Sequence, residues 1–415
     1  MSTSPDMPPT LRRAISLPLL VLYGLGVTIG AGIYVLVGAT AATAGPYAPS
    51  AFIVAALVML FSAGSFAELS GRVPQSAGEA AYVEAGFRTP FLTLFTGALL
   101  LAATIVSSAA ITVGSAGYIA VLAPLEPWTI ILGVIVLTFG LAAWGIVESV
   151  AFAALLTLLE IGGLVVVVAA GLSLDPGMLS SLPEVIPPFS DSAALASVGI
   201  ASLTAFFAFI GFDSMVNIVE ETKDPSRNMP LGILLTLIIA TLLYFSVALV
   251  AVKTLPLEEL GQSTAPISLL FERLTGFSPV VITLIAVGAT INGVVIQTVL
   301  AARVLYGLGN VGRLPRALAR LNPRTRTPVF ATVLVSLTTA VFALFFPIDV
   351  LAERTTQVVL VVFILINAAL LRMKLRGDPA PEDVFTVPLI VPLIGLLSCL
   401  AMLVGPLLLA GGYLL

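Results

Sequence analysis

The strongest constraint on this chain is a series of long apolar segments. Eleven runs of roughly 18 residues or more are long enough to cross a bilayer as helices. They span residues 17–40, 49–71, 90–116, 129–147, 150–172, 197–221, 230–252, 278–306, 329–347, 350–371 and 387–413. Because lipid cannot satisfy backbone polar groups, we expect an all-α polytopic membrane protein with about 11 transmembrane helices.

Composition excludes several other classes of protein. Only 10% of the 415 residues are charged, against about 25% in soluble domains. The single cysteine, Cys399, cannot form an intrachain disulfide, and the absence of histidine removes histidine metal sites and Ser-His-Asp triads. The net charge of −4 is too small to suggest a nucleic-acid partner. We therefore expect no nucleic acid, cofactor or metal site, and a monomer or weak oligomer in the bilayer.

The basic residues predict the orientation of the chain in the membrane. If the N-terminus is cytoplasmic, fifteen of the eighteen Lys and Arg residues fall on the cytoplasmic side, as the positive-inside rule requires. The three on the outer side are Lys253, Arg273 and Arg354. The polar residues 1–16 then form a cytoplasmic tail, not a cleaved signal peptide.

The first apolar run contains four glycines within nine residues: Gly24, Gly26, Gly30 and Gly32. Each costs up to about 1 kcal/mol relative to alanine inside a helix. One interpretation is a helix that is interrupted where it lines a polar cavity. The alternative is that the glycines only allow close packing between helices.

A second apolar run with an interruption lies five spans later. The run 197–221 carries Gly211 and an acid, Asp213, well inside its apolar part. Because five is odd, two five-helix halves that each begin with an interrupted helix must enter the membrane from opposite sides. This arrangement is typical of transporters built from inverted repeats, and it favours the cavity interpretation of the first glycine run.

These observations divide the chain into five parts. The expected parts are a tail over 1–16, a first five-helix repeat over 17–172, an outer loop over 173–196, a second inverted repeat over 197–371, and a cytoplasmic loop with an eleventh helix over 372–415. The connections have no room for a soluble domain.

Four motifs lie in a fixed order along the chain. They cover residues 26–34, 67–79, 206–214 with 220–230, and 303–306 with 312–315 and 322–328. Together they resemble the amino acid–polyamine–organocation (APC) superfamily of transporters, most closely its bacterial amino acid permeases and its cationic amino acid transporter branch. The resemblance covers about residues 15–375 and implies a LeuT-type 5+5 inverted repeat with discontinuous helices 1 and 6.

The resemblance also implies how a substrate would be bound. Free N–H groups at the start of a half-helix bind anions, since they lie at the positive end of the helix dipole. By resemblance, amides around Gly30 to Gly32 take the substrate carboxylate, and carbonyls of both interrupted helices take its ammonium. The implied substrate-binding residues are Thr28, Ile29, Gly30, Ala31, Gly32, Phe207, Ala208 and Ile210.

Other residues near the predicted interruptions have two interpretations each. Phe207 matches an aromatic position that acts as a gate in relatives, or it is ordinary packing. Asp213 is expected to cap the half-helix that follows it. The hydroxyls of Thr104, Ser107, Ser108 and Thr112 in the third span either line a pocket or bond within their own helix.

A lone acid, Glu160, lies in the middle of the fifth span. Many relatives that do not use sodium carry a lysine there, so their lysine mechanism cannot be transferred to this chain. A buried carboxyl tends to be protonated, and our hypothesis is a proton site coupled to transport. The alternatives are a role in binding a metal cation or the substrate ammonium, and a neutral structural carboxyl.

The sequence therefore predicts a secondary active amino acid transporter that works by alternating access, and not an enzyme. No ATP-binding loop is present, so the energy must come from a gradient, for example of protons, or from exchange. The alternatives are an amine or polyamine transporter, an amino-acid sensor on the same fold, and a membrane-embedded enzyme. The expected location is a bacterial or archaeal inner membrane.

Overall fold

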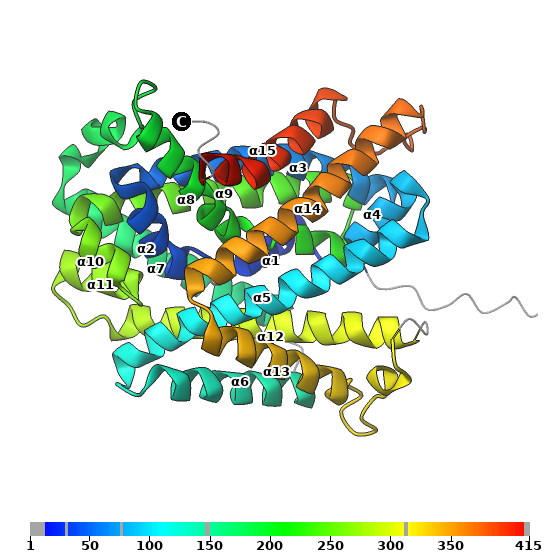
Figure 1. Cartoon of the computed structure of the whole chain (residues 1–415), viewed down its shortest axis with the longest axis horizontal. Coiled ribbons are helices and arrows are strands. Elements are labelled where there is room, and N and C mark those ends of the chain that lie inside the picture. The colour runs from blue at the N-terminus through cyan, green and yellow to red at the C-terminus, as the bar shows by residue number, and fades with distance from the viewer. Residues whose placement is uncertain (1–12, 30–31, 75–77, 146–149, 311–313, 411–415) are drawn as a thin grey trace, which may run out of the picture.

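The computed structural model describes residues 13–29, 32–74, 78–145, 150–310 and 314–410 (Figure 1). Within these ranges most residues are helical. The sole pairing of extended backbone among them is a parallel bridge between Ile15 and Thr222. This bridge ties the start of the described chain to the segment that precedes α9.

The described residues of the first half of the chain form seven α-helices. They are α1 (Leu17–Ile29), α2 (Gly32–Ala44), α3 (Ala48–Arg72), α4 (Gly78–Phe87), α5 (Pro90–Leu122), α6 (Pro127–Trp144) and α7 (Val150–Leu174). Two 3₁₀ helices, η1 (Gly45–Tyr47) and η2 (Pro176–Val185), lie in the connections.

In the second half, the part of the chain that the structure describes forms eight α-helices. They are α8 (Ser192–Phe209), α9 (Pro225–Thr254), α10 (Leu257–Gln262), α11 (Pro266–Thr275), α12 (Val280–Asn310), α13 (Val329–Phe345), α14 (Ile348–Leu375) and α15 (Ile390–Ala410). The 3₁₀ helix η3 (Phe212–Glu221) follows α8, and η4 (Arg316–Ala319) follows α12.

The predicted apolar runs coincide with these helices. Among the described residues, eight helical stretches are long and apolar enough to cross a membrane, and α1, α13 and α15 are shorter apolar helices. The runs 17–40 and 197–221 each correspond to a pair of helices, α1 with α2 and α8 with η3. The prediction of an all-α polytopic membrane fold is therefore confirmed.

The 197–221 run changes conformation at Ile210 and Gly211. The helix α8 ends at Phe209, Ile210 is extended, and Gly211 has a φ of +133°. Only glycine adopts this conformation without strain. A Cβ at Gly211 would also lie 2.8 Å from the carbonyl oxygen of Val27 on α1, so both the backbone conformation and the close neighbour require glycine here.

The helices α1, α2 and α8 occupy the interior of the bundle. The helix α2 packs along α8, while α3 packs on both α8 and α9. In Figure 1, α5 and α14 run side by side across the molecule, and α6, α12 and α13 lie together along one edge. The two chain segments that contain the predicted binding residues are thus enclosed by other helices.

Short helices in the connections were not predicted from hydropathy. The helices α10 and α11 lie between α9 and α12 in the chain. Both contact α2 and α9, and α11 also contacts α7 and α12. With 6 and 10 residues they are too short to cross a bilayer. They cover the end of α2 that lies away from Gly32.

A buried polar cluster joins α3, α14 and α15. The Asn367 amide accepts a hydrogen bond from Ser65 Oγ at 2.7 Å and donates to Ser62 Oγ at 2.9 Å. Ser62 in turn contacts Cys399 Sγ at 3.4 Å. Since polar groups are costly to bury in an apolar bundle unless they are paired, this cluster fixes how the three helices face one another.

A buried ion cluster lies at the end of α3. Glu68 is fully buried, and its carboxylate lies 2.8 Å from both Arg72 Nε and Lys374 Nζ. It also accepts the backbone N–H of Val387 at 2.7 Å. The cluster ties α3 and α14 to the loop before α15.

Candidate binding site where α1, α2 and α8 meet

Two chain segments far apart in sequence meet at the centre of the bundle. The Tyr244 hydroxyl on α9 lies 2.9 Å from the Thr28 carbonyl oxygen and 3.0 Å from the Ala208 carbonyl oxygen. It has one proton to donate, which it shares between the two acceptors. A single side chain therefore bridges α1 and α8 next to the ends of both helices.

Close backbone packing brings the start of α2 against α8. A Cβ at Gly32 would lie 2.3 Å from the Ala208 Cα and 2.9 Å from its carbonyl oxygen. No real Cβ contact is this short, so Gly32 is required for the two helices to approach as they do. The helix start at Gly32 is thus held directly beside Ala208.

The predicted site residues occupy buried positions around this junction. Thr28, Ile29 and Ala208 are almost fully buried, and Phe207 is 6% exposed. The Phe207 carbonyl accepts the Ile210 N–H at 3.1 Å, so it is part of the turn that ends α8. Gly30 and Ala31, which are predicted to bind the carboxylate, lie outside the described residues.

Two other glycines of the first run have a packing role. A Cβ at Gly24 would lie 2.5 Å from the Met215 sulfur, and a Cβ at Gly26 would lie 2.2 Å from Thr157 Oγ1. Close packing between helices therefore accounts for Gly24 and Gly26.

A cavity of about 510 Å³ extends from the end of α8. Its volume is within the range of about 300–1,000 Å³ that is typical of small-molecule sites. Ile210, one of the predicted binding residues, lines this cavity. Two of the hydroxyl-bearing residues of the third span, Thr104 and Ser107, line it as well. It is also lined by Glu79, Ala80, Gly97, Leu100, Ala103, Gly211, Asp213, Ser214, Asn217, Gln297, Leu300, Arg303, Val304, Thr355 and Val359.

The cavity contains two buried carboxyl groups, Glu79 on α4 and Asp213 on η3. One Asp213 carboxylate oxygen accepts the Gly211 N–H at 2.8 Å. Asp213 was expected to be an N-cap, but that position belongs to Gly211, and Asp213 lies in the first turn of η3. It stabilises the turn before the helix because its side chain reaches back by two residues.

Burial and the nearby Asp213 carboxylate raise the pKa of Glu79 from 4.5 to about 8. The folded protein therefore holds a proton on Glu79 that the unfolded chain releases between these two values. The unfolded chain binds fewer protons in this window, so stability must fall as pH rises.

We expect the thermal unfolding midpoint of the purified protein to fall as pH rises from about 5 to 8. A tenfold difference in proton affinity is worth about 1.4 kcal/mol, so the loss amounts to several kcal/mol. A Glu79→Gln variant should lose most of this dependence and be more stable than wild type at pH 8. Equal slopes of midpoint against pH for both proteins would show that Glu79 is not responsible.

Glu160 lies on α7 beside the same junction. It is 3% exposed, and its backbone carbonyl accepts the Tyr34 hydroxyl at 2.7 Å. On its other side it lines a hollow of about 270 Å³ between α7 and α12. The carboxyl group also stands near the residue that bridges Thr28 and Ala208.

Several groups at the site were not predicted from the sequence. Tyr244 lies in an apolar run with no neighbouring signal, and Gln297 bonds across the cavity to Ser107 Oγ at 3.4 Å. Glu79 could have been recognised as an acid within a mostly apolar segment, Ala-Gly-Glu-Ala-Ala-Tyr. Among the described residues, no group of three or more Cys, Asp or Glu side chains is arranged to hold a metal ion.

Comparison with known families identifies the fold. The family model described as amino acid permease matches residues 15–412, which is nearly the whole chain. The chain belongs to the amino acid permease family. This permease family, part of the APC superfamily, consists of transporters, so the membrane-embedded enzyme is excluded.

The relatives of this chain are named for different substrates. The chain is 33% identical over 392 residues to cationic amino acid transporter 2, vacuolar, of Arabidopsis thaliana. This alignment covers 88% of the chain and 60% of the relative. It is 28% identical over 418 residues to the branched-chain amino acid permease BcaP of Bacillus subtilis, in an alignment that covers 95% of the chain and 88% of the relative. It is 30% identical over 423 residues to the methylthioribose transporter of the same species, in an alignment that covers 94% of the chain and 88% of the relative. The chain thus spans three fifths of the plant relative and most of the bacterial ones.

Proposed function

We propose that this permease is a secondary active transporter of amino acids that works by alternating access. The observation that carries the proposal is the junction at which Tyr244 bridges the Thr28 and Ala208 carbonyls while Gly32 packs on Ala208. Carbonyl oxygens at the ends of α1 and α8 can accept an ammonium group, and the amides at the start of α2 can donate to a carboxylate. Both groups are present in every α-amino acid.

Recognition by backbone groups leaves the substrate side chain to the surrounding residues. In this proposal Phe207 acts as the gate over the bound substrate, and Ile210 leads into the cavity of about 510 Å³. The relatives named above carry cationic or branched-chain amino acids, or methylthioribose. The side chain that this permease accepts therefore depends on its own pocket.

The position of the cavity supports access to the binding site from one side of the membrane. The cavity reaches from Ile210 to Arg303, and Arg303 is one of the fifteen basic residues that the sequence predicts on the cytoplasmic side. By the positive-inside rule the Arg303 end is cytoplasmic, with the N-terminus on the same side. We therefore assign the cavity as the route between the binding site and the cytoplasm of a bacterial or archaeal cell.

The direct test is uptake by the purified protein in liposomes. Radiolabelled amino acids should accumulate when the interior holds unlabelled substrate or when a proton gradient is imposed. Protein-free liposomes and a Gly32→Ala variant provide the controls. Binding of amino acids without any transport would instead indicate a sensor on the same fold.

The Tyr244 hydroxyl is expected to be needed for tight substrate binding. A Tyr244→Phe variant leaves two buried carbonyls without their shared donor, which costs about 1–3 kcal/mol. We expect an apparent affinity roughly tenfold weaker, equivalent to about 1.4 kcal/mol, measured as the KM of uptake. Tyr306→Phe on α12 is a matched control that should behave as wild type. An unchanged KM in Tyr244→Phe would remove this residue from the site.

Glu160 is proposed to carry the proton that couples transport to the gradient. Its support is its burial and its place beside Tyr34 and Tyr244. We expect Glu160→Gln to retain exchange of internal for external substrate but to lose at least tenfold of the uptake driven by a proton gradient. Uptake measured between pH 5 and 8 provides the check, and the same pH dependence in both proteins would leave Glu160 with a structural role.

A further inference from the structure

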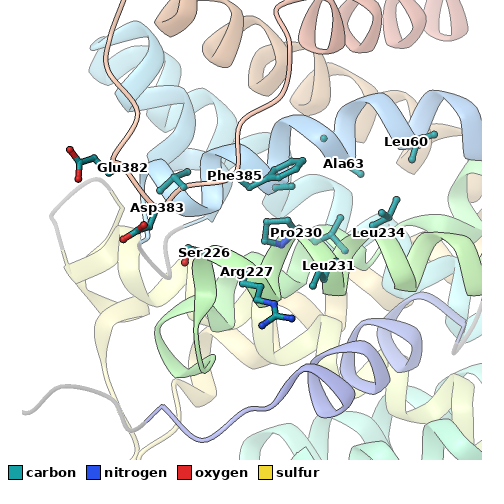
Figure 2. Close-up of a pocket in the computed structure, with 14 residues that line it drawn as sticks. Leu60, Ala63, Ser226, Arg227, Pro230, Leu231, Leu234, Glu382, Asp383 and Phe385 are labelled. Atoms are coloured by element: carbon teal, nitrogen blue, oxygen red, sulfur yellow. The ribbon is translucent and has the colours of Figure 1, made fainter.

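A groove on the lipid-facing side of the bundle lies apart from the proposed substrate site. It has a volume of about 590 Å³ and lies between α3, α9 and the loop that precedes α15 (Figure 2). Small residues form its α3 side, namely Ala63, Gly64 and Ala67. Leu60 and Leu231 are 40% and 37% exposed along its edges. The groove is therefore an apolar recess that opens toward the bilayer.

One end of this groove is charged. Arg227 lies in the first turn of α9, and the loop contributes Glu382 and Asp383. Figure 2 shows the Arg227 guanidinium directed away from both carboxylates. No carboxylate among the described residues lies within 4.0 Å of the Arg227 side chain, so its charge is not used in an ion pair of the described chain.

The apolar part of the groove continues along the membrane. A second hollow of about 260 Å³ also begins at Leu60 and runs between α3 and α9 past Leu237 to Leu242. The two hollows together follow one helix pair from its charged end toward the middle of the bilayer. The two hollows are charged at one end and apolar along their length, as a membrane lipid has a charged headgroup and apolar acyl chains.

We propose that the groove binds a phospholipid with a zwitterionic, ammonium-bearing headgroup of the phosphatidylethanolamine type. Arg227 takes the phosphate, because a guanidinium pairs well with phosphate oxygens. Glu382 and Asp383 take the ammonium and disfavour a headgroup with net negative charge. One acyl chain lies over Ala63 and Gly64 and continues into the second hollow.

The test is a comparison of three phospholipids with identical acyl chains on the delipidated full-length protein in detergent. Lipid that binds the folded state raises the unfolding midpoint. Phosphatidylethanolamine should raise it more than phosphatidylcholine or phosphatidylglycerol does. In Arg227→Ala, about tenfold more phosphatidylethanolamine should be needed for the same shift, as expected for a lost hydrogen bond to a charged group.

Two further variants make the result specific. In Glu382→Gln/Asp383→Asn, phosphatidylethanolamine should lose its advantage over the other two lipids. Arg316→Ala, an exposed arginine away from the groove, should respond as wild type does. All substituted side chains are exposed, so these variants should fold. Equal shifts for the three lipids, a larger shift with phosphatidylglycerol, or an unchanged response in Arg227→Ala would overturn the proposal.

Discussion

A Gly32→Ala variant is expected to lose amino acid uptake by about 100-fold or more. The added Cβ would lie 2.3 Å from the Ala208 Cα, and backbone cannot move aside as a flexible side chain can. Overpacking of this kind costs about 1–3 kcal/mol. It also pushes α2 away from α8, and a displacement of about 1 Å in a functional site can reduce activity roughly 100-fold. Uptake in liposomes, normalised to folded protein, measures the effect.

The matched control is Gly133→Ala on α6. A Cβ at Gly133 would meet no other atom within 4 Å, so this variant gains only the better helix propensity of alanine. Size-exclusion profiles and unfolding midpoints of both variants separate loss of function from loss of folding. Wild-type uptake by a correctly folded Gly32→Ala protein would contradict the close contact between α2 and α8.

A Glu68→Gln variant is expected to be destabilised by about 3–5 kcal/mol. Removal of this charge leaves Arg72 and Lys374, whose side chains are 7% and 13% exposed, without the carboxylate that both contact at 2.8 Å. Breaking a buried ion cluster by removing one partner carries a cost of this size. The neutral amide also has only one acceptor oxygen left for Arg72, Lys374 and the Val387 amide. The unfolding midpoint in detergent measures the effect.

An exposed ion pair in the same protein provides the comparison. Glu259 lies 2.7 Å from Arg273, and both side chains are more than one third exposed. A Glu259→Gln variant should lose less than about 1 kcal/mol, as surface pairs do. If Glu68→Gln and Glu259→Gln shift the unfolding midpoint equally, the buried cluster is not a stabilising element of the fold.

The membrane fold could be predicted from the sequence because hydropathy and length alone determine which segments cross a bilayer. The predicted run 90–116 became α5 at Pro90–Leu122, and 278–306 became α12 at Val280–Asn310. The conformational change in the sixth run was also predictable, since Gly211 stands inside an otherwise apolar helix. Boundaries differed because helices continue beyond the apolar core into polar residues.

The individual contacts at the junction could not be predicted in the same way. The hydroxyl of Tyr244 reaches Thr28 across 216 residues of sequence, and no local pattern encodes such a pairing. The four glycines of the first run look alike in sequence, yet Gly24 and Gly26 pack against side chains while Gly32 packs on backbone. Their separate roles depend on which helix lies opposite each one.

In the proposed function, backbone groups of α1, α2 and α8 recognise both ends of an α-amino acid. The most direct measurement is the unfolding midpoint of the purified protein with each amino acid in turn. The best ligand is then compared with its decarboxylated amine and its deaminated acid. We predict a clear upward shift with the amino acid and little or none with either partial ligand. An equal shift with the amine alone, or no shift with any amino acid, would show that these backbone groups do not recognise an α-amino acid.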